Sequence, residues 1–90
     1  MSGERFRRAA GVLSRRFGGE VLLGLRGRAE VDRLEGTAAA VWELLEGPAT
    51  AAEVAAALAA SYDAPASAIE RDVRALLSEL AARGYVEREA

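Results

Sequence analysis

The chain has 90 residues, none of them Cys or His, and its 12 arginines and 14 acidic residues leave a formal net charge of −2. This length predicts one domain, and the missing residue types exclude disulfides, thiolate metal sites and His-dependent catalysis. No apolar run approaches the roughly 18 residues of a membrane-spanning helix, and the N-terminal "MSGERFRRAAG" lacks the apolar core of a signal peptide, so we expect a cytoplasmic protein.

The N-terminal third of the chain predicts short strands. Residues 1–10 are polar and basic, and we expect them to be flexible, with a single domain over residues 11–90. Residues 11–34, "GVLSRRFGGEVLLGLRGRAEVDRL", have the pattern of three short antiparallel strands, the first two joined by a two-residue hairpin at Gly18-Gly19. The third strand, residues 28–34, is the most polar and fits the edge of a sheet. Alternating apolar residues of the second strand should face the core: Val21, Leu23 and Leu25.

Three helices are predicted to follow the strands. Two of the expected first residues, Thr50 and Ser67, have a glutamate three residues later, which is the spacing of a capping box. The helices are expected to begin at Thr37, Thr50 and Ser67, and the first and third to end near Glu46 and Arg83. A three-stranded antiparallel sheet followed by three helices predicts an α+β fold that is winged helix-turn-helix-like.

The third helix carries an apolar stripe at helical spacing. Its members are Ile69, Val73, Leu76, Leu77 and Leu80. Leu77 lies to one side of the centre of this stripe, with Arg74 and Ala81 beside it. We therefore expect Leu77 to lie half in the core and half in any groove along that flank.

A fold of this kind can read DNA with its third helix or take up a peptide at its sheet edge. Residues 1–33 hold eight arginines and four acidic residues, whereas residues 34–90 hold four arginines and ten acidic residues. An acidic helical half counts against a winged-helix transcription regulator, because DNA readers place positive charge near phosphate. The third strand, "RAEVDRL", contains no Pro and offers an unbroken row of backbone donors and acceptors. Its charges also fit an edge that repels other chains, and the pattern alone favours neither reading.

Two stretches decide between these alternatives: "RLEGTAAAVWELLEGPATAAEVAAALAASYDAP" and, after it, "IERDVRALLSELAARGYVE". Together they resemble the PqqD family, whose members are also called RiPP recognition elements, after ribosomally made and modified peptides. The matching positions are Leu34, Thr37, Ala38, Val41 to Leu45, Gly47, Thr50, Glu53, Val54, Asp72, Val73, Leu76, Leu77, Leu80, Gly84, Tyr85 and Val86. The sequence departs from the family at Glu35-Gly36, where Asn-Pro or Asn-x is common, and this concerns the turn into the first helix.

The resemblance implies a non-catalytic adaptor without cofactor or metal. Such proteins hold the leader segment of a precursor peptide antiparallel to the third strand, in a groove against the third helix, and present it to modifying enzymes. Those enzymes include a leader peptidase, a cyclase or a radical-SAM enzyme, in lasso-peptide or PQQ-like pathways, and the "VWELLEGPAT" segment is slightly closer to the lasso-peptide members. A monomer or weak dimer is expected, with no nucleic acid or membrane as partner. Carried onto this sequence, the peptide-binding residues are Arg28, Ala29, Glu30, Val31, Asp32, Arg33, Leu34, Arg74, Leu77, Ser78 and Ala81.

Overall fold

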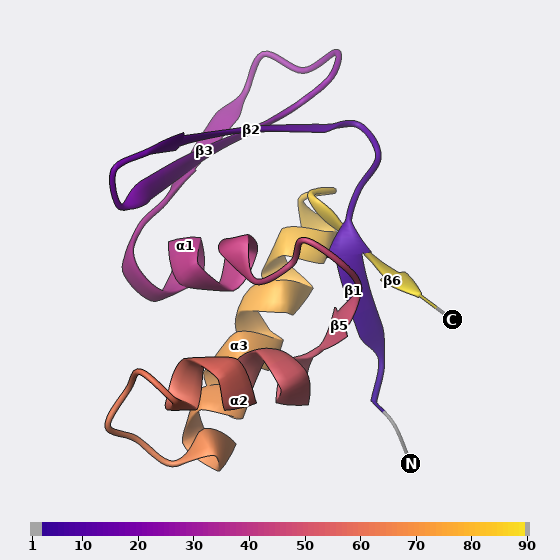
Figure 1. Cartoon of the computed structure of the whole chain (residues 1–90). Coiled ribbons are helices and arrows are strands. Elements are labelled where there is room, and N and C mark those ends of the chain that lie inside the picture. The colour runs from indigo at the N-terminus through magenta and orange to yellow at the C-terminus, as the bar shows by residue number, and fades with distance from the viewer. Residues whose placement is uncertain (1–2, 90) are drawn as a thin grey trace.

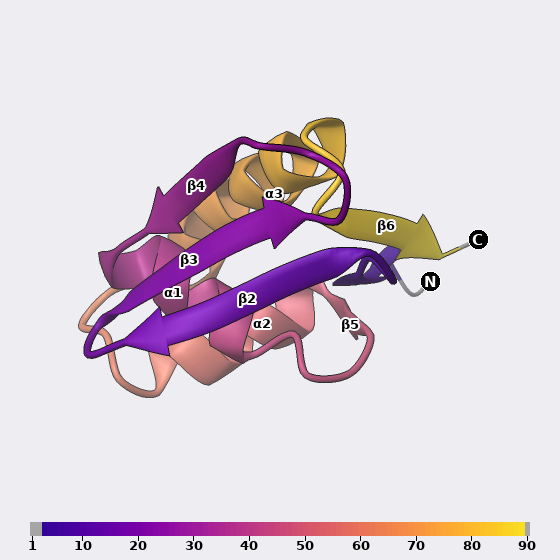
Figure 2. The same ribbon diagram turned by 90° about the horizontal axis from the view of Figure 1, so that it is seen from above.

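The computed structural model describes residues 3–89, which form two three-stranded antiparallel sheets and three helices. The strands are β1 (Arg5–Arg8), β2 (Val12–Phe17), β3 (Glu20–Leu25), β4 (Val31–Leu34), β5 (Ala49–Thr50) and β6 (Val86–Glu89). The helices are α1 (Gly36–Glu43), α2 (Ala51–Ala59) and α3 (Ala66–Ala82). The sheet of β2, β3 and β4, which has the longer strands and is called the larger sheet below, lies over one side of the helices. β1, β5 and β6 lie at one end of the helices (Figures 1 and 2). The expected α+β class is confirmed.

The larger sheet has the order β2-β3-β4, so β4 is an edge strand, as predicted. The hairpin turn at Gly18, with φ of 55°, uses the backbone freedom of glycine. β4 begins at Val31, three residues later than expected. Gly27 has φ of 88°, and the Arg28 N–H donates to the Leu25 carbonyl at 2.9 Å. This turn keeps residues 28–30 out of the strand.

The second sheet has the order β5-β1-β6, and its strand β1 lies within the segment, residues 1–10, that was expected to be flexible. β1 is its central strand, although Met1 and Ser2 lie outside the described residues. The register places Arg7 opposite Glu87, with an ion pair of 3.0 Å. Phe6 of β1 is buried, so an apolar contact with the core and the ion pair of Arg7 with Glu87 hold this strand in place.

The helix starts agree with the sequence at only one of three positions. At Thr50 both capping-box bonds form: the Thr50 hydroxyl accepts from the Glu53 N–H at 3.0 Å, and the Glu53 carboxylate accepts from the Thr50 N–H at 2.8 Å. The expected caps at Thr37 and Ser67 are wrong. Glu35 and Pro65 occupy those N-cap positions without a side-chain cap bond. Gly36, with φ of 56°, turns the chain before Thr37, and Pro65 places Ala66 at the first helical position.

Replacing Thr50 by alanine is expected to lower the free energy of unfolding by about 1 kcal/mol, because the Glu53 N–H in the first turn of α2 loses its hydroxyl acceptor. The Thr50 backbone bond lowers the pKa of Glu53 below its ordinary value of 4.5, against an opposing effect of desolvation. The contribution of Glu53 is therefore present at neutral pH and is lost as the pH falls through this lowered pKa. Urea denaturation at pH 7 measures the effect. Thr37→Ala is the matched control, and an equal loss in both variants would contradict the capping role.

One core fills the space between the larger sheet and the helices. Trp42, Leu23 and Leu77 are among its fully buried side chains. The Arg8 guanidinium lies 4.6 Å from the centroid of the Trp42 ring and donates to the Trp42 carbonyl at 2.6 Å, which ties β1 to α1. Within residues 3–89, no helix is long and apolar enough to cross a bilayer.

Candidate functional site

β4 has a free edge beside α3 within residues 3–89. β4 pairs with β3 on one side, and no other strand of the described chain pairs with it. In the register with β3, Asp32 and Leu34 lie opposite the buried Leu23 and Val21, so they point toward the helices. Val31 and Arg33 alternate with them and point to the outer face of the sheet. A peptide strand added to this edge would place alternate side chains toward α3.

Two pockets lie between β4 and the C-terminal part of α3. The N-terminal pocket, beside the start of β4, has a volume of about 370 Å³ and is lined by Arg28, Glu30, Val31, Asp32, Arg83 and Tyr85. The C-terminal pocket, beside the end of β4, has a volume of about 200 Å³. Asp32, Arg83 and Tyr85 line this pocket too, together with Leu34, Leu76, Glu79 and Leu80. One pocket is therefore polar, and the other has an apolar floor.

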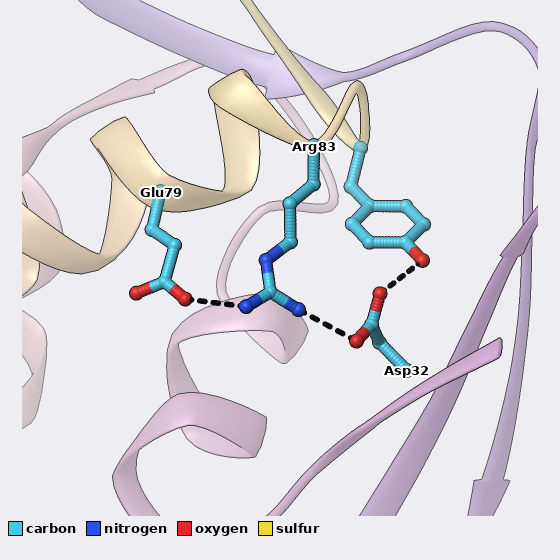
Figure 3. Close-up of polar contacts among 4 residues, drawn as sticks. Asp32, Glu79 and Arg83 are labelled. Atoms are coloured by element: carbon cyan, nitrogen blue, oxygen red, sulfur yellow. Dashed lines mark hydrogen bonds and ion pairs between the residues drawn. The ribbon is translucent and has the colours of Figure 1, made fainter. Parts of the chain in front are cut away.

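A polar bridge joins β4 to α3 between these pockets (Figure 3). Arg83 donates to Asp32 at 2.6 Å and to Glu79 at 2.8 Å, and the Tyr85 hydroxyl donates to Asp32 at 2.5 Å. Burial raises the pKa of Tyr85 to about 12, with a further contribution from its hydrogen bond to Asp32. Tyr85 thus keeps its proton at physiological pH and holds the Asp32 carboxylate toward α3.

Most residues predicted on the third strand do line this region. Besides the lining residues already described, Arg33 lines the C-terminal pocket, and Ala29 is exposed in the segment that leads into β4. Arg33 also lies 3.8 Å from both Glu20 and Glu35.

The residues predicted on α3 need correction. Leu77 has an exposed fraction of 0%, so it belongs wholly to the core and cannot line a groove. Arg74 and Ser78 line a different hollow, together with Phe6 and Thr50, on the flank of α3 that faces β1. Ala81 is half-buried against the core and lines neither groove pocket.

The groove side of α3 consists of residues that sequence reasoning missed. These are Leu76, Glu79, Leu80 and Arg83, with Tyr85 just beyond the helix. The helical residues among them are three or four positions apart, so they lie on one face of the helix. This spacing in the sequence could have identified them. The choice between the two flanks depended on the second sheet, since β6 contacts the other flank through the bond from Arg88 to Ser78.

Residues 18–86 match the family described as coenzyme PQQ synthesis protein D (PqqD). The chain belongs to the PqqD family. The predicted resemblance is therefore confirmed. No curated protein matches this PqqD-family chain.

Two solved structures resemble this PqqD-family protein over nearly its whole length. One, described as "TbiB1 in Complex with the TbiA(beta) Leader Peptide", has a TM-score of 0.85 and 27% sequence identity, covering 93% of this chain and 98% of that one. The other, "Lasso peptide synthetase B1 complexed with the leader peptide", has a TM-score of 0.78 and 28% identity, covering 91% and 96%. Both neighbours are complexes of small proteins with leader peptides.

The charges on α3 agree with this family rather than with a DNA reader. Arg74 pairs with Glu70, and Arg83 pairs with Glu79, each one turn away on the same helix. These glutamates would repel phosphate. Among residues 3–89, no group of three acidic side chains is placed to hold a metal ion.

Proposed function

We propose that this protein binds the leader segment of a ribosomally made precursor peptide at the free edge of β4 and presents it to modifying enzymes without catalysing a reaction itself. The observation that carries the proposal is the unpaired β4 edge beside two pockets, in a fold that matches a leader-bound protein with a TM-score of 0.85. We infer that it acts in the cytoplasm, where ribosomes release precursors, as a monomer or weak dimer.

The groove suits an extended peptide for physical reasons. Backbone groups of β4 supply hydrogen bonds that are independent of the peptide sequence, and the pockets supply selection. Leu34, Leu76 and Leu80 offer an apolar floor for one side chain. Arg28 and Glu30 offer polar partners for another. A leader that runs antiparallel to β4 meets the apolar pocket nearer its own N-terminus.

Backbone methylation of the peptide tests strand addition without altering the protein. A series of synthetic TbiA(beta) leaders, each with one N-methyl group at a different backbone position, is titrated calorimetrically into the protein. We expect alternate positions to lose affinity, because only every second N–H of an added strand faces β4. Equal tolerance of methylation at all positions would rule out binding by strand addition.

Arg28→Ala is expected to weaken binding of an acidic leader by about 0.5–1 kcal/mol, and more at low salt than at high salt. Arg28 lines the N-terminal pocket and takes no ion pair within residues 3–89, whereas Arg33 and Arg74 lie beside glutamates. Its charge is therefore available to a ligand. Calorimetric titration at two salt concentrations measures the effect, with Arg74→Ala as the control. A larger loss in the control would place the peptide on the β1 flank.

We further propose that partner enzymes dock on the outer face of the larger sheet. Leu13, Phe17 and Val31 are exposed there by 52%, 56% and 63%, and Leu13 and Val31 line a hollow of about 480 Å³ over Gly24. An apolar patch on a small protein commonly marks an interaction site. The enzymes expected are a leader peptidase, a cyclase or a radical-SAM enzyme.

Leu13→Glu is expected to leave leader affinity unchanged and to reduce processing of the precursor by the partner enzyme by about tenfold or more, because a charge replaces an apolar contact. Leader titration and a processing assay measure the two properties. Ala56→Glu, at an exposed position of α2 that does not line this hollow, serves as the control for added charge. Loss of leader affinity in Leu13→Glu would mean that the patch belongs to the peptide site.

A further inference from the structure

The two groove pockets share the same inner wall. Asp32, Arg83 and Tyr85 line both of them. These residues form the polar bridge, which runs from β4 to Arg83 at the C-terminal end of α3 (Figure 3).

Arg83 is held in this position from two sides. Its guanidinium donates to Asp32 and to Glu79, and Asp32 is itself held by the hydroxyl of the buried Tyr85. The ion pairs are partly exposed, with Arg83 at 48% and Asp32 at 34%, and such pairs add little to stability. Arg83 is therefore of interest for where its side chain lies in the groove, and not for what its ion pairs contribute to the free energy of unfolding.

We propose that Arg83 is a specificity-determining residue that divides the groove, so that a leader is read as two separate side chains rather than one bulky one. This inference rests on the proposed leader-binding function. An apolar side chain of limited size fits against Leu34, Leu76 and Leu80, and a second side chain enters the polar pocket beside Arg28. A large aromatic side chain at either position would compete for the space that the Arg83 guanidinium occupies between Asp32 and Glu79.

The chain supplies a matched control on the same helix. Arg74 pairs with Glu70 one turn away, as Arg83 does with Glu79, but it lies on the β1 flank. Arg83→Ala and Arg74→Ala therefore remove the same charge and the same type of helical ion pair. Only the first of them opens the wall between the pockets.

The test starts from a randomised displayed peptide library selected on the wild-type protein. Alanine scanning of a selected peptide identifies its two anchoring side chains, and each is then replaced by Leu and by Trp. We expect the wild type to bind the Trp peptides more weakly than the Leu peptides. In Arg83→Ala the ratio of the two dissociation constants should fall by about tenfold, because space replaces a fixed side chain. Arg74→Ala should keep the wild-type ratio.

The possible results separate the two proposals. If Arg83→Ala shifts the affinity for Leu and Trp peptides by one common factor, Arg83 does not divide the groove. The same conclusion follows if Arg74→Ala changes the ratio equally. If the folded wild-type protein enriches no peptide from the library, the leader-binding function itself is wrong. Thermal unfolding of both variants beforehand verifies that each is folded.

Discussion

Leu77→Ala is expected to lower the free energy of unfolding by about 2–5 kcal/mol, because it leaves a cavity in a close-packed core. Leu77 has an exposed fraction of 0% and lies on the core face of α3 with Ile69 and Val73. A domain of this kind has a total stability of about 5–15 kcal/mol, so this loss is a large part of it. Urea denaturation followed by circular dichroism measures the change.

Leader affinity provides the second half of this test. In buffer without urea, at a temperature where Leu77→Ala is folded, the affinity of this variant for a leader should equal that of the wild type. Leu77 lines neither groove pocket. Leu76→Ala should behave in the opposite way, with a small loss of stability and a clear loss of affinity. If Leu77→Ala keeps wild-type stability but loses the leader, the groove follows the other flank of α3.

The parts of the fold that the sequence predicted are those coded by neighbouring residues. Gly18-Gly19 between two strand-like runs specified the β2–β3 hairpin, and Thr50 with Glu53 specified the start of α2. The apolar stripe of the third helix included the four buried residues of α3, which are Ile69, Val73, Leu77 and Leu80. Each of these patterns is set within one element, so no knowledge of tertiary packing was needed.

The second sheet could not be predicted in the same way. β1 has four residues and β5 has two, which is too short for alternation to be recognised. One partner of β1 in the sheet is β6, at the other end of the chain. Arg7 lies opposite Glu87 in this register, and that match of charges has meaning only once the two ends are known to meet.

This missing sheet explains why the residues predicted on α3 do not line the pockets beside β4. The edge of β4 followed from a local property, the lack of Pro in a polar terminal strand. The flank of α3 that faces β4 depends on how the helix is rotated in the molecule. The flank of Ser78 faces β1 and β6, with a bond from Arg88 to Ser78, whereas the flank of Leu76 and Arg83 faces β4.

Leu76→Glu is expected to weaken leader binding by about 3 kcal/mol or more, which is about 100-fold or more in the dissociation constant. Leu76 is half-buried and lies in the apolar part of the C-terminal pocket with Leu34 and Leu80. In the free protein a glutamate at this position can reach water, so folding should be retained with a modest loss of stability. A bound leader would cover the carboxylate, and Glu79 beside it would add repulsion rather than a partner.

Ala75→Glu is the matched control, because residue 75 is exposed, lies on the same helix and lines neither groove pocket. It adds the same charge and should leave the dissociation constant within about twofold of the wild type, as surface substitutions usually do. Calorimetric titration of one leader into both variants, after their folding is verified by circular dichroism, gives the comparison. Equal affinities in Leu76→Glu and Ala75→Glu would show that the leader does not enter the C-terminal pocket, and that β4 binds it through the backbone and the N-terminal pocket alone.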